Sequence, residues 1–533
     1  MSSRRWLILI VLAGGMLRLF PIWFGLPYLR ARPDEDMSIA IAYRMLSGDL
    51  HPRFFHWPSL TFYIFAALYW CACAIKGAFS LEAGLSQTEQ IVIGRIFVAC
   101  AGTATLAVVY SIGRRVRDDV TGLIAAALLA VAMLHVRESH FAMTDVIMTL
   151  LVTASLAVLL HGVDEQETAR RVRLFAAAGF LGGLAASTKY TAAAVLAAVA
   201  AAHILALRRP WRTAVSWPVW QPSLAYALCF ACGFGMATPY ALLDFAAFKE
   251  GMLFNVRHMS EGHAVPLGRG FKYHPTYSLP YGMGPTAYAA GLAGVLVLAF
   301  RYRRHGFILL SFVAALYLSL GPGRTVFFRY VLPLVPVLCV AAAIAIRDAA
   351  DWLGPQLRVS RTAAAGGLIC VVGIPGLVNS IWFDSLLART DSRVLAGWWL
   401  ESRLQPTDTL YDDGGVYVVL DLSRAAFRRS LFDPASNSFS EGAAQTPEWL
   451  ILYESPVKAY ASTRLELRDL ARREYELVQT VRATRGRQRS AVYDLQDAFF
   501  MPLWGFWTVE RPGPTIRIYR RKAPFVMLQL ELR

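Results

Sequence analysis

The sequence has little charge and no cysteine outside its apolar runs. Charged residues make up 17% of the 533 positions and hydrophobic residues 56%, a balance unlike that of a soluble protein of this length. All seven cysteines lie in apolar stretches, so no disulfide framework is expected, and the pair at 229 and 232 is interpreted as buried packing. Internal repeats are also lacking. These deficits exclude a disulfide-stapled secreted protein and an ordinary soluble enzyme.

Acidic residues are outnumbered, and the formal net charge is +16 at pH 7. A basic excess is also a feature of proteins that bind nucleic acid. Here, however, the arginines cluster in short loops between apolar runs, which is typical of cytoplasmic anchors under the positive-inside rule. We therefore expect membrane lipids as partners and no nucleic acid. The clusters are 114–117, 170–173, 208–209 and 301–304.

Long apolar runs recur through most of the chain. The first, Trp6 to Phe24, follows two arginines and ends without a small-residue cleavage site, so we interpret it as a retained span with a cytoplasmic N-terminus. The run 59–79 is assigned to the interface or to a re-entrant segment, because a crossing there would place every basic cluster outside. The sequence thus predicts a polytopic α-helical membrane protein with about 11 transmembrane helices. The further spans are expected at about 91–112, 120–136, 146–161, 174–187, 191–207, 223–238, 286–300, 307–320, 331–346 and 362–380.

The C-terminal region differs in character from the rest. Charge density rises there, and strand-like runs occur at 416–420, 449–453 and 515–519 after a predicted helix at about 392–403. We therefore expect a transmembrane domain over 1–381 and a small soluble α/β domain over 382–533. Loop parity places this domain, with loops 25–90 and 239–285, on the outer face.

An acidic pair, Asp34 and Glu35, follows Pro33 just after the first apolar run. Proline suits the first turn of a helix, and carboxylates there favour the helix dipole. A helical projection places Asp34 and Glu35 on the apolar face of 34–47 and Asp36 opposite. Helix capping explains Asp36 well, but caps have no need of the apolar face. Acidic groups at a membrane boundary favour function, so Asp34 and Glu35 are candidate catalytic residues.

A second acidic candidate lies between two predicted spans. Asp145 ends the polar stretch 137–145, on the same predicted face as Asp34, and it either caps the following helix or has a catalytic or anchoring role. A divalent metal is left open as a cofactor, but no metal ligand is assigned because the spacing of the nearby polar residues matches no recognised pattern. Those residues are Glu138, His140, His51 and His56.

Cations are also expected on the outer face, against the positive-inside bias. Lys189 lies where two apolar runs meet, and Arg324, Arg329 and Tyr330 lie within 323–330. These four are candidates for binding a phosphate, with snorkelling at the interface as the alternative for the cations. A carboxylate base beside a cationic phosphate site suits transfer from a phosphate-linked lipid donor, since the base takes the acceptor's proton and the cations stabilise the leaving phosphate.

At these residues the chain resembles the GT-C superfamily of membrane glycosyltransferases, in the family 39-like branch of protein O-mannosyltransferases and lipid A aminoarabinose transferases. The resemblance implies an inverting transfer from a polyprenyl-phosphate-linked sugar. Asp34, with Glu35 beside it, matches the catalytic acidic position, and Asp145 resembles the second one. Lys189 and Arg329 resemble positions near the carrier phosphate. The matching segments are 34–35, 42–46, 48–49, 57–63, 137–145, 183–190 and 329–333.

The chain departs from the eukaryotic mannosyltransferases because it has no repeat-type luminal domain. We therefore expect a bacterial enzyme of the inner (plasma) membrane that transfers a hexosyl or pentosyl group to a cell-envelope lipid, glycan or protein. A secondary transporter or lipid-carrier flippase is the alternative, and it would place ionisable residues at mid-membrane in broken helices. A non-catalytic subunit of an envelope complex is a third hypothesis.

Overall fold

The chain folds into two compact units in a computed structural model that describes residues 2–79, 84–207, 216–433, 436, 438–440, 446–486 and 490–522. The first unit combines Met1–Trp23 with Asp34–Ser385, and the second combines Phe24–Pro33 with Leu386–Arg533. The sequence placed the boundary at 381 and treated 25–90 as one loop. The structure instead assigns the segment Phe24–Pro33 to the C-terminal unit.

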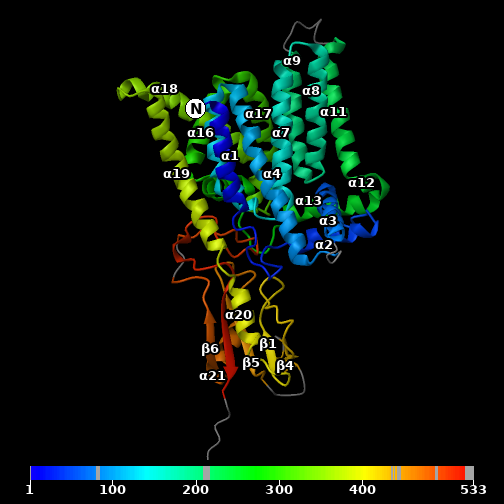
Figure 1. Cartoon of the computed structure of the whole chain (residues 1–533), viewed down its shortest axis with the longest axis vertical. Coiled ribbons are helices and arrows are strands. Elements are labelled where there is room, and N and C mark those ends of the chain that lie inside the picture. Colours follow the sequence, from blue (N-terminus) through cyan, green and yellow to red (C-terminus); the bar gives the residue numbers. More distant parts are fainter. Residues whose placement is uncertain are drawn as a thin grey trace, which may run out of the picture. The chain divides into compact units, whose positions relative to one another are not determined.

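The first unit is a bundle of long helices (Figure 1). Helices α7, α8 and α11 run side by side, as do α1, α4 and α5, and α16 with α18. Caps fix several helix starts: Ser86 and Glu89 form a capping box before α4, and Asp118 caps α5. The long elements are α1 (Ser3–Leu19), α4 (Gln87–Val116), α5 (Asp119–Ala130), α7 (Thr144–Asp164), α8 (Thr168–Ala186), α9 (Leu196–Leu207), α11 (Trp217–Ala237), α16 (Pro285–Phe300), α17 (Arg303–Leu320), α18 (Leu334–Gln356) and α19 (Arg361–Leu387).

The predicted apolar spans coincide largely with these helices. The predicted span 120–136 is split into α5 and the short α6 (Met133–Glu138). By length and composition, five described helices can cross a membrane, or six if the pair Gly270–Met283 and Pro285–Phe300, bent by 115°, is one span. The protein is therefore a helical membrane protein, and the number of about eleven spans stays a prediction.

The segment 59–79 forms helix α3 (Leu60–Ala78), which is long and apolar enough to span. Its polar contacts to α4 involve the first turns of that helix: the Tyr69 hydroxyl donates to the Gln90 carbonyl, and the Lys76 ammonium pairs with Glu89. In Figure 1, α3 lies with α2 (Glu35–Arg44) and α13 (Phe245–Glu261) at one end of the bundle. The assignment of this segment to the interface or to a re-entrant segment stays a prediction.

The predicted loop 239–285 is largely helical. Its principal element is α13 (Phe245–Glu261), which Asp244 caps by accepting from the backbone of Ala247. The remaining elements are α12 (Tyr240–Leu243), α14 (Gly270–Tyr273), the π-helical turn η3 (His274–Ser278) and α15 (Leu279–Met283). These helices were not predicted, because the spans were identified from long apolar runs and charged residues interrupt α13, which is amphipathic.

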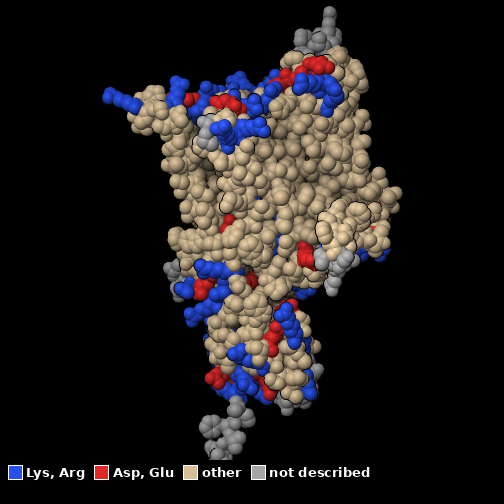
Figure 2. Space-filling view, viewed as in Figure 1, with Lys and Arg blue, Asp and Glu red and all other residues tan. Residues whose placement is uncertain are grey.

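Basic side chains gather at the opposite end of the bundle, beyond a wide uncharged zone (Figure 2). Arg117 pairs with Asp348 and Asp351, and Arg304 pairs with Asp164. We call this region the arginine end. The length of helix α7 gives the distance between the arginine end and Asp145, because Asp145 and Asp164 lie at opposite ends of that helix. At 1.5 Å per residue they are about 30 Å apart, which is the thickness of a bilayer's hydrocarbon core.

The second unit contains a five-stranded mixed sheet in the order β2-β1-β5-β7-β6 and a two-stranded pair, β3-β4. The predicted helix and two predicted strands are present, as α20 (Ser392–Glu401), β5 (Trp449–Glu454) and β7 (Thr515–Arg521). The predicted strand 416–420 is wrong, because it is a turn that follows Gly414 and Gly415. The other elements are β1 (Thr409–Asp412), β2 (Arg428–Arg429), β3 (Leu431–Asp433), β4 (Ser438–Ser440), α21 (Leu465–Glu474) and β6 (Tyr475–Val481).

The segment Phe24–Pro33 is held inside this second unit by specific contacts. The Arg32 guanidinium forms a buried ion pair with Asp497 at 2.6 Å, and the Tyr28 hydroxyl donates to the Val419 carbonyl. The guanidinium of Arg393 lies 4.4 Å from the centre of the Tyr28 ring. A segment from the N-terminal part of the chain is therefore part of the core of the C-terminal unit.

Candidate functional site

Four charged side chains from distant segments meet in the first unit. Arg329 Nη2 lies 3.6 Å from Asp34 Oδ2, and Arg329 Nε lies 4.0 Å from Asp145 Oδ2. Lys189 Nζ donates to Asp145 Oδ1 at 2.6 Å. The structure thus brings together Asp34, Asp145, Lys189 and Arg329, which we call the charged cluster.

Asp34 lies directly before α2, but it does not act as a helix cap. Its carboxylate makes no capping hydrogen bond, and its backbone is left-handed, with φ of 70°. Aspartate tolerates this conformation better than most residues, and such backbones gather at functional sites. The carboxylate keeps about a quarter of its surface accessible (24%) and faces Arg329. The capping explanation therefore does not account for Asp34.

Asp145 is likewise not a cap. It lies in the first turn of α7, where Met143 holds the cap position, and it is buried. Its Oδ1 binds Lys189, and its Oδ2 accepts no hydrogen bond from the described residues. A buried carboxylate oxygen without a donor is costly unless cations lie near. Asp145 therefore holds the two cations of the cluster in place.

The cations are packed against aromatic rings. Lys189 follows α8 and precedes the 3₁₀ turn η2 (Tyr190–Val195), and its Nζ lies 4.5 Å from the centre of the Tyr330 ring. Arg329 lies in the short turn η4 (Phe328–Val331), with its guanidinium carbon 4.2 Å from the centre of the Phe327 ring. Cation–π contacts of this kind hold a charge in place without neutralising it. The rings thus fix the positions of both cations beside the two carboxylates.

Glu35 does not share the site of Asp34. Its carboxylate is fully buried and binds Arg95 through two contacts, Nε to Oε1 at 2.9 Å and Nη2 to Oε2 at 2.6 Å. It also accepts from the Ala142 backbone at 2.7 Å. The helical projection placed both carboxylates on one face because it assumed helical backbone at Asp34, where the backbone is left-handed. A single arginine inside the run 91–112 was the available signal for this ion pair.

Contacts outside the charged cluster hold Arg324 and two of the residues considered for a metal, and Glu138 pairs with Arg137. Arg324 is exposed, and its backbone donates to the Met259 carbonyl. His140 contacts the carbonyls of Val136 and Phe20, and His51 pairs with Asp244. Among the described residues, no group of three or more His, Cys, Asp or Glu side chains could hold a metal ion.

A series of rings leads from a surface cavity to Arg329, and sequence reasoning did not find it. The cavity measures about 800 Å³ and includes His51, Asp244 and Glu250 in its lining. His56 stacks on Phe254 at 3.7 Å with an interplanar angle of 8°, and Phe254 stacks on His258 at 5.6 Å. The ring series, in order, is His56, Phe254, His258, His263 and Phe327.

The ring series is expected to depend on pH. Burial lowers the pKa of His56 and, with the neighbouring His263 and Arg329, that of His258. A lowered pKa favours the neutral imidazole in the folded state, so its stabilisation is full above the unfolded pKa of about 6.5 and is lost as pH falls. We therefore expect the free energy of unfolding to decrease below about pH 6. A His56→Phe variant, which keeps the stack without the titration at this position, should lose less stability on acidification, and thermal unfolding over a pH series measures the difference.

Comparisons with known proteins agree with this fold. The family model described as dolichyl-phosphate-mannose-protein mannosyltransferase matches residues 80–236. No curated protein matches the chain. Among solved structures, ArnT from Cupriavidus metallidurans in the apo state is similar with a TM-score of 0.53 and 16% identity, over 97% of this chain and 98% of that one.

The archaeal oligosaccharyltransferase of Archaeoglobus fulgidus is also similar. Its apo form matches with a TM-score of 0.51 and 16% identity, over 76% of this chain. The complex of that enzyme, AglB, with an inhibitory peptide and a dolichol-phosphate matches with a TM-score of 0.50, 15% identity and 75% of this chain. This chain covers 58% of the archaeal protein in both cases. The resemblance to the GT-C superfamily is confirmed at the level of the fold.

Proposed function

We propose that the protein is an inverting glycosyltransferase that moves a sugar from a polyprenyl-phosphate-linked donor to a hydroxyl of a cell-envelope acceptor. The observation that carries this proposal is the charged cluster, in which a partly accessible carboxylate, Asp34, lies 3.6 Å from the guanidinium of Arg329. The matches to the mannosyltransferase family model and to a structure that holds a dolichol-phosphate support a lipid-linked donor.

In the proposed step, the acceptor oxygen attacks the anomeric carbon of the donor sugar. The new glycosidic C–O bond forms as the bond from that carbon to the phosphate oxygen breaks, and attack from the opposite face inverts the configuration. The proton of the acceptor hydroxyl passes to the Asp34 carboxylate, which acts as the general base. The bonding electrons leave with the phosphate, so the polyprenyl phosphate departs without a general acid.

Lys189 and Arg329 stabilise the charge that develops on the leaving phosphate. Asp145 is a positioning residue, because it holds the ammonium at 2.6 Å and lies within 4.0 Å of the guanidinium. The Tyr330 ring packs against the Lys189 ammonium. Glu35 is also a positioning residue, since its ion pair with Arg95 fixes the helix start that carries Asp34. Arg324 stays a candidate for contacting the carrier phosphate from outside the charged cluster.

The proposed location is the outer face of a bacterial plasma membrane. The arginine end and Asp145 lie at opposite ends of α7, about 30 Å apart. The positive-inside rule places the arginine end in the cytoplasm, and the charged cluster then lies at the outer boundary. On that face the cluster meets both lipid-linked donors and envelope acceptors.

A transporter shares one feature with this structure, the helix break of 115° before α16. Transport through such a break requires ionisable groups near mid-membrane. The break lies instead at Gly284, between Met283 and Pro285, and glycine carries no ionisable side chain. The charged cluster, at the end of the bundle, favours the transferase.

Two measurements test the proposed function. Mass spectrometry of envelope lipids, glycans and glycoproteins from a deletion strain should show one sugar missing from one acceptor. Purified protein given the corresponding polyprenyl-phosphate sugar and that acceptor should then restore the linkage with inverted configuration. Transfer with retained configuration, or transport of the intact donor without transfer, would contradict the proposal.

Replacing Arg329 should weaken binding of the carrier phosphate. We expect Arg329→Gln to raise the Kd for polyprenyl phosphate more than tenfold, because a charge-assisted contact contributes about 1.5–3 kcal/mol. Arg324→Gln is the matched variant, and its effect should be severalfold smaller since Arg324 is exposed. Ligand-induced stabilisation against thermal unfolding measures both. Equal effects of the two variants would place the phosphate away from the charged cluster.

A further inference from the structure

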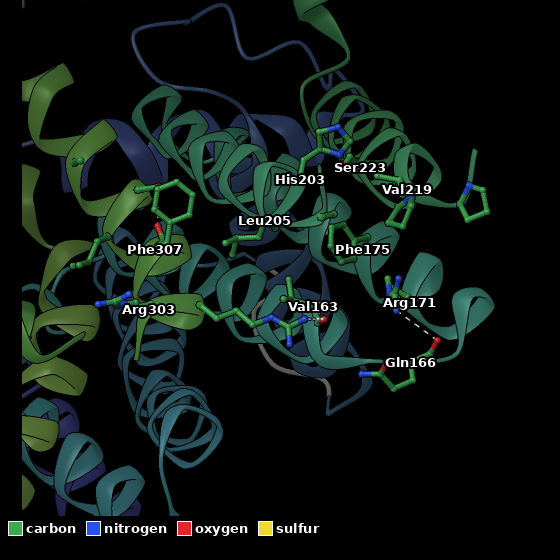
Figure 3. Close-up of a pocket in the computed structure, with 18 of the residues that line it drawn as sticks. Val163, Gln166, Arg171, Phe175, His203, Leu205, Val219, Ser223, Arg303 and Phe307 are labelled. Carbon is green, nitrogen blue, oxygen red and sulfur yellow. Dashed lines mark hydrogen bonds between the residues drawn. The ribbon is translucent and has the colours of Figure 1, made fainter. Parts of the chain in front are cut away.

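A second cavity, drawn in Figure 3, lies at the arginine end of the bundle. It measures about 920 Å³ and is formed by residues of α7, α8, α9, α11, α16 and α17. Val163, next to Asp164 at the end of α7, is one of its lining residues. The cavity is therefore about one bilayer thickness from Asp145. The proposed transfer reaction does not use it.

The polar lining of this cavity is basic. Arg171, Arg303 and Arg304 line it, whereas no aspartate or glutamate is among the described lining residues. Arg303 is exposed, and its Nε donates to the Phe300 carbonyl, which orients the guanidinium without neutralising it. Arg304 differs, because it pairs with Asp164. The cavity thus favours an anionic ligand.

Further inside, the cavity offers one polar pair between apolar walls. His203 Nδ1 lies 3.0 Å from the Ser223 hydroxyl, and its Nε2 is buried without a hydrogen-bond partner among the described residues. A buried ring nitrogen of this kind is suited to a hydrogen bond with a bound ligand. The walls around it are apolar and include Leu205, Val219 and Phe307 (Figure 3).

We propose that this cavity binds an anionic glycerophospholipid from the leaflet at the arginine end. Arg171 and Arg303 contact the phosphate, the His203–Ser223 pair meets the glycerol and ester groups, and the apolar walls take the first part of an acyl chain. Basic pockets between helices at a cytoplasmic membrane surface are suited to such headgroups. The volume also fits a headgroup with a short length of chain. The lipid carrier of the proposed reaction is a different ligand, because its phosphate meets the charged cluster at the other end of α7.

The test is native mass spectrometry of the full-length protein with phosphatidylglycerol, phosphatidylcholine or polyprenyl phosphate. We expect phosphatidylglycerol to bind more tightly than the zwitterionic lipid. The double variant Arg171→Gln/Arg303→Gln should lower phosphatidylglycerol affinity about 30-fold, since each arginine near a membrane surface contributes about fivefold. Arg361→Gln is the matched control, because Arg361 is an exposed arginine outside the cavity lining. It should bind the lipid like the wild type.

A second variant keeps the charges and fills the cavity. Ala206, on α9, lines the apolar wall, and Ala206→Phe should reduce phosphatidylglycerol binding while both arginines remain. Thermal unfolding shows whether each variant is folded. If a variant does not fold, the preference of the wild-type protein for phosphatidylglycerol over phosphatidylcholine is the deciding result.

Equal binding of the two phospholipids overturns the proposal, as does wild-type affinity in the folded double variant. A stronger preference for polyprenyl phosphate, lost in the double variant, also overturns it by assigning the cavity to the carrier. Failure here leaves sugar transfer intact, so it is distinguishable from failure of the proposed function.

Discussion

Asp34→Asn is expected to lower kcat for sugar transfer by about 10³-fold, within the range that a positioned general base contributes. Asparagine keeps the size and polarity of the side chain, but it cannot take a proton from the acceptor hydroxyl. In energetic terms the loss is about 4 kcal/mol of transition-state stabilisation. The KM for the donor should change little, because the cations that meet the phosphate remain.

The measurement is single-turnover transfer from a polyprenyl-phosphate sugar by purified protein. Asp36→Asn is the matched control, since Asp36 lies two residues away and its Oδ1 accepts from the backbone of Met37. The control should transfer at nearly the wild-type rate. Wild-type turnover by a folded Asp34→Asn variant would rule Asp34 out as the base.

Arg95→Met should destabilise the protein by about 3–5 kcal/mol, the usual cost of leaving one partner of a buried ion pair unpaired. Both side chains of the Glu35–Arg95 pair are fully buried, with 0% of each exposed. The second substitution in Glu35→Gln/Arg95→Met removes the stranded charge, and glutamine still offers an oxygen to the Ala142 backbone. The double variant should therefore be more stable than Arg95→Met alone.

Thermal and denaturant unfolding in a fixed detergent measure these changes. Arg114→Met, on the same helix α4, breaks an ion pair whose side chains are 64% and 42% exposed, and it should cost less than about 1 kcal/mol. A positioning role for Glu35 adds a kinetic signature. Glu35→Gln should lower kcat and leave the KM for the donor nearly unchanged, because Glu35 acts through the position of Asp34 and the cations that meet the phosphate remain. A large rise in the KM for the donor would instead give Glu35 a direct part in donor binding.

Much of the helical framework was predictable because long apolar runs have a direct physical meaning in a membrane protein. The strand 449–453 was predictable for a different reason, since a short apolar run with aromatic ends fits the centre of a sheet. The run 416–420 is also apolar and contains more β-branched residues, yet it is a turn in which Val418 and Leu420 remain buried. Periodicity records burial, and burial alone does not distinguish a strand from a packed turn.

The site was predictable in part. Shared membrane sidedness was enough to predict that Asp34, Asp145, Lys189 and Arg329 lie on one face, and the structure places them in contact. Sidedness carries no information about distance, so it did not separate Glu35 from Asp34. The left-handed backbone that separates them is a tertiary feature. The ring series was also hidden, because its members come from four segments and none is unusual alone.

The contribution of Phe24–Pro33 to the second unit limits how this protein can be recombined with its relatives. A C-terminal unit that consisted of one continuous stretch could be exchanged at a single junction. Here the unit is discontinuous, and its Arg32–Asp497 and Tyr28–Val419 contacts join residues more than 390 positions apart. A chimera therefore needs matched junctions before Phe24, after Pro33 and near Ser385. Because Pro33 directly precedes Asp34, one of those junctions adjoins the proposed base, and the second unit and the proposed reaction centre are expected to be inherited together.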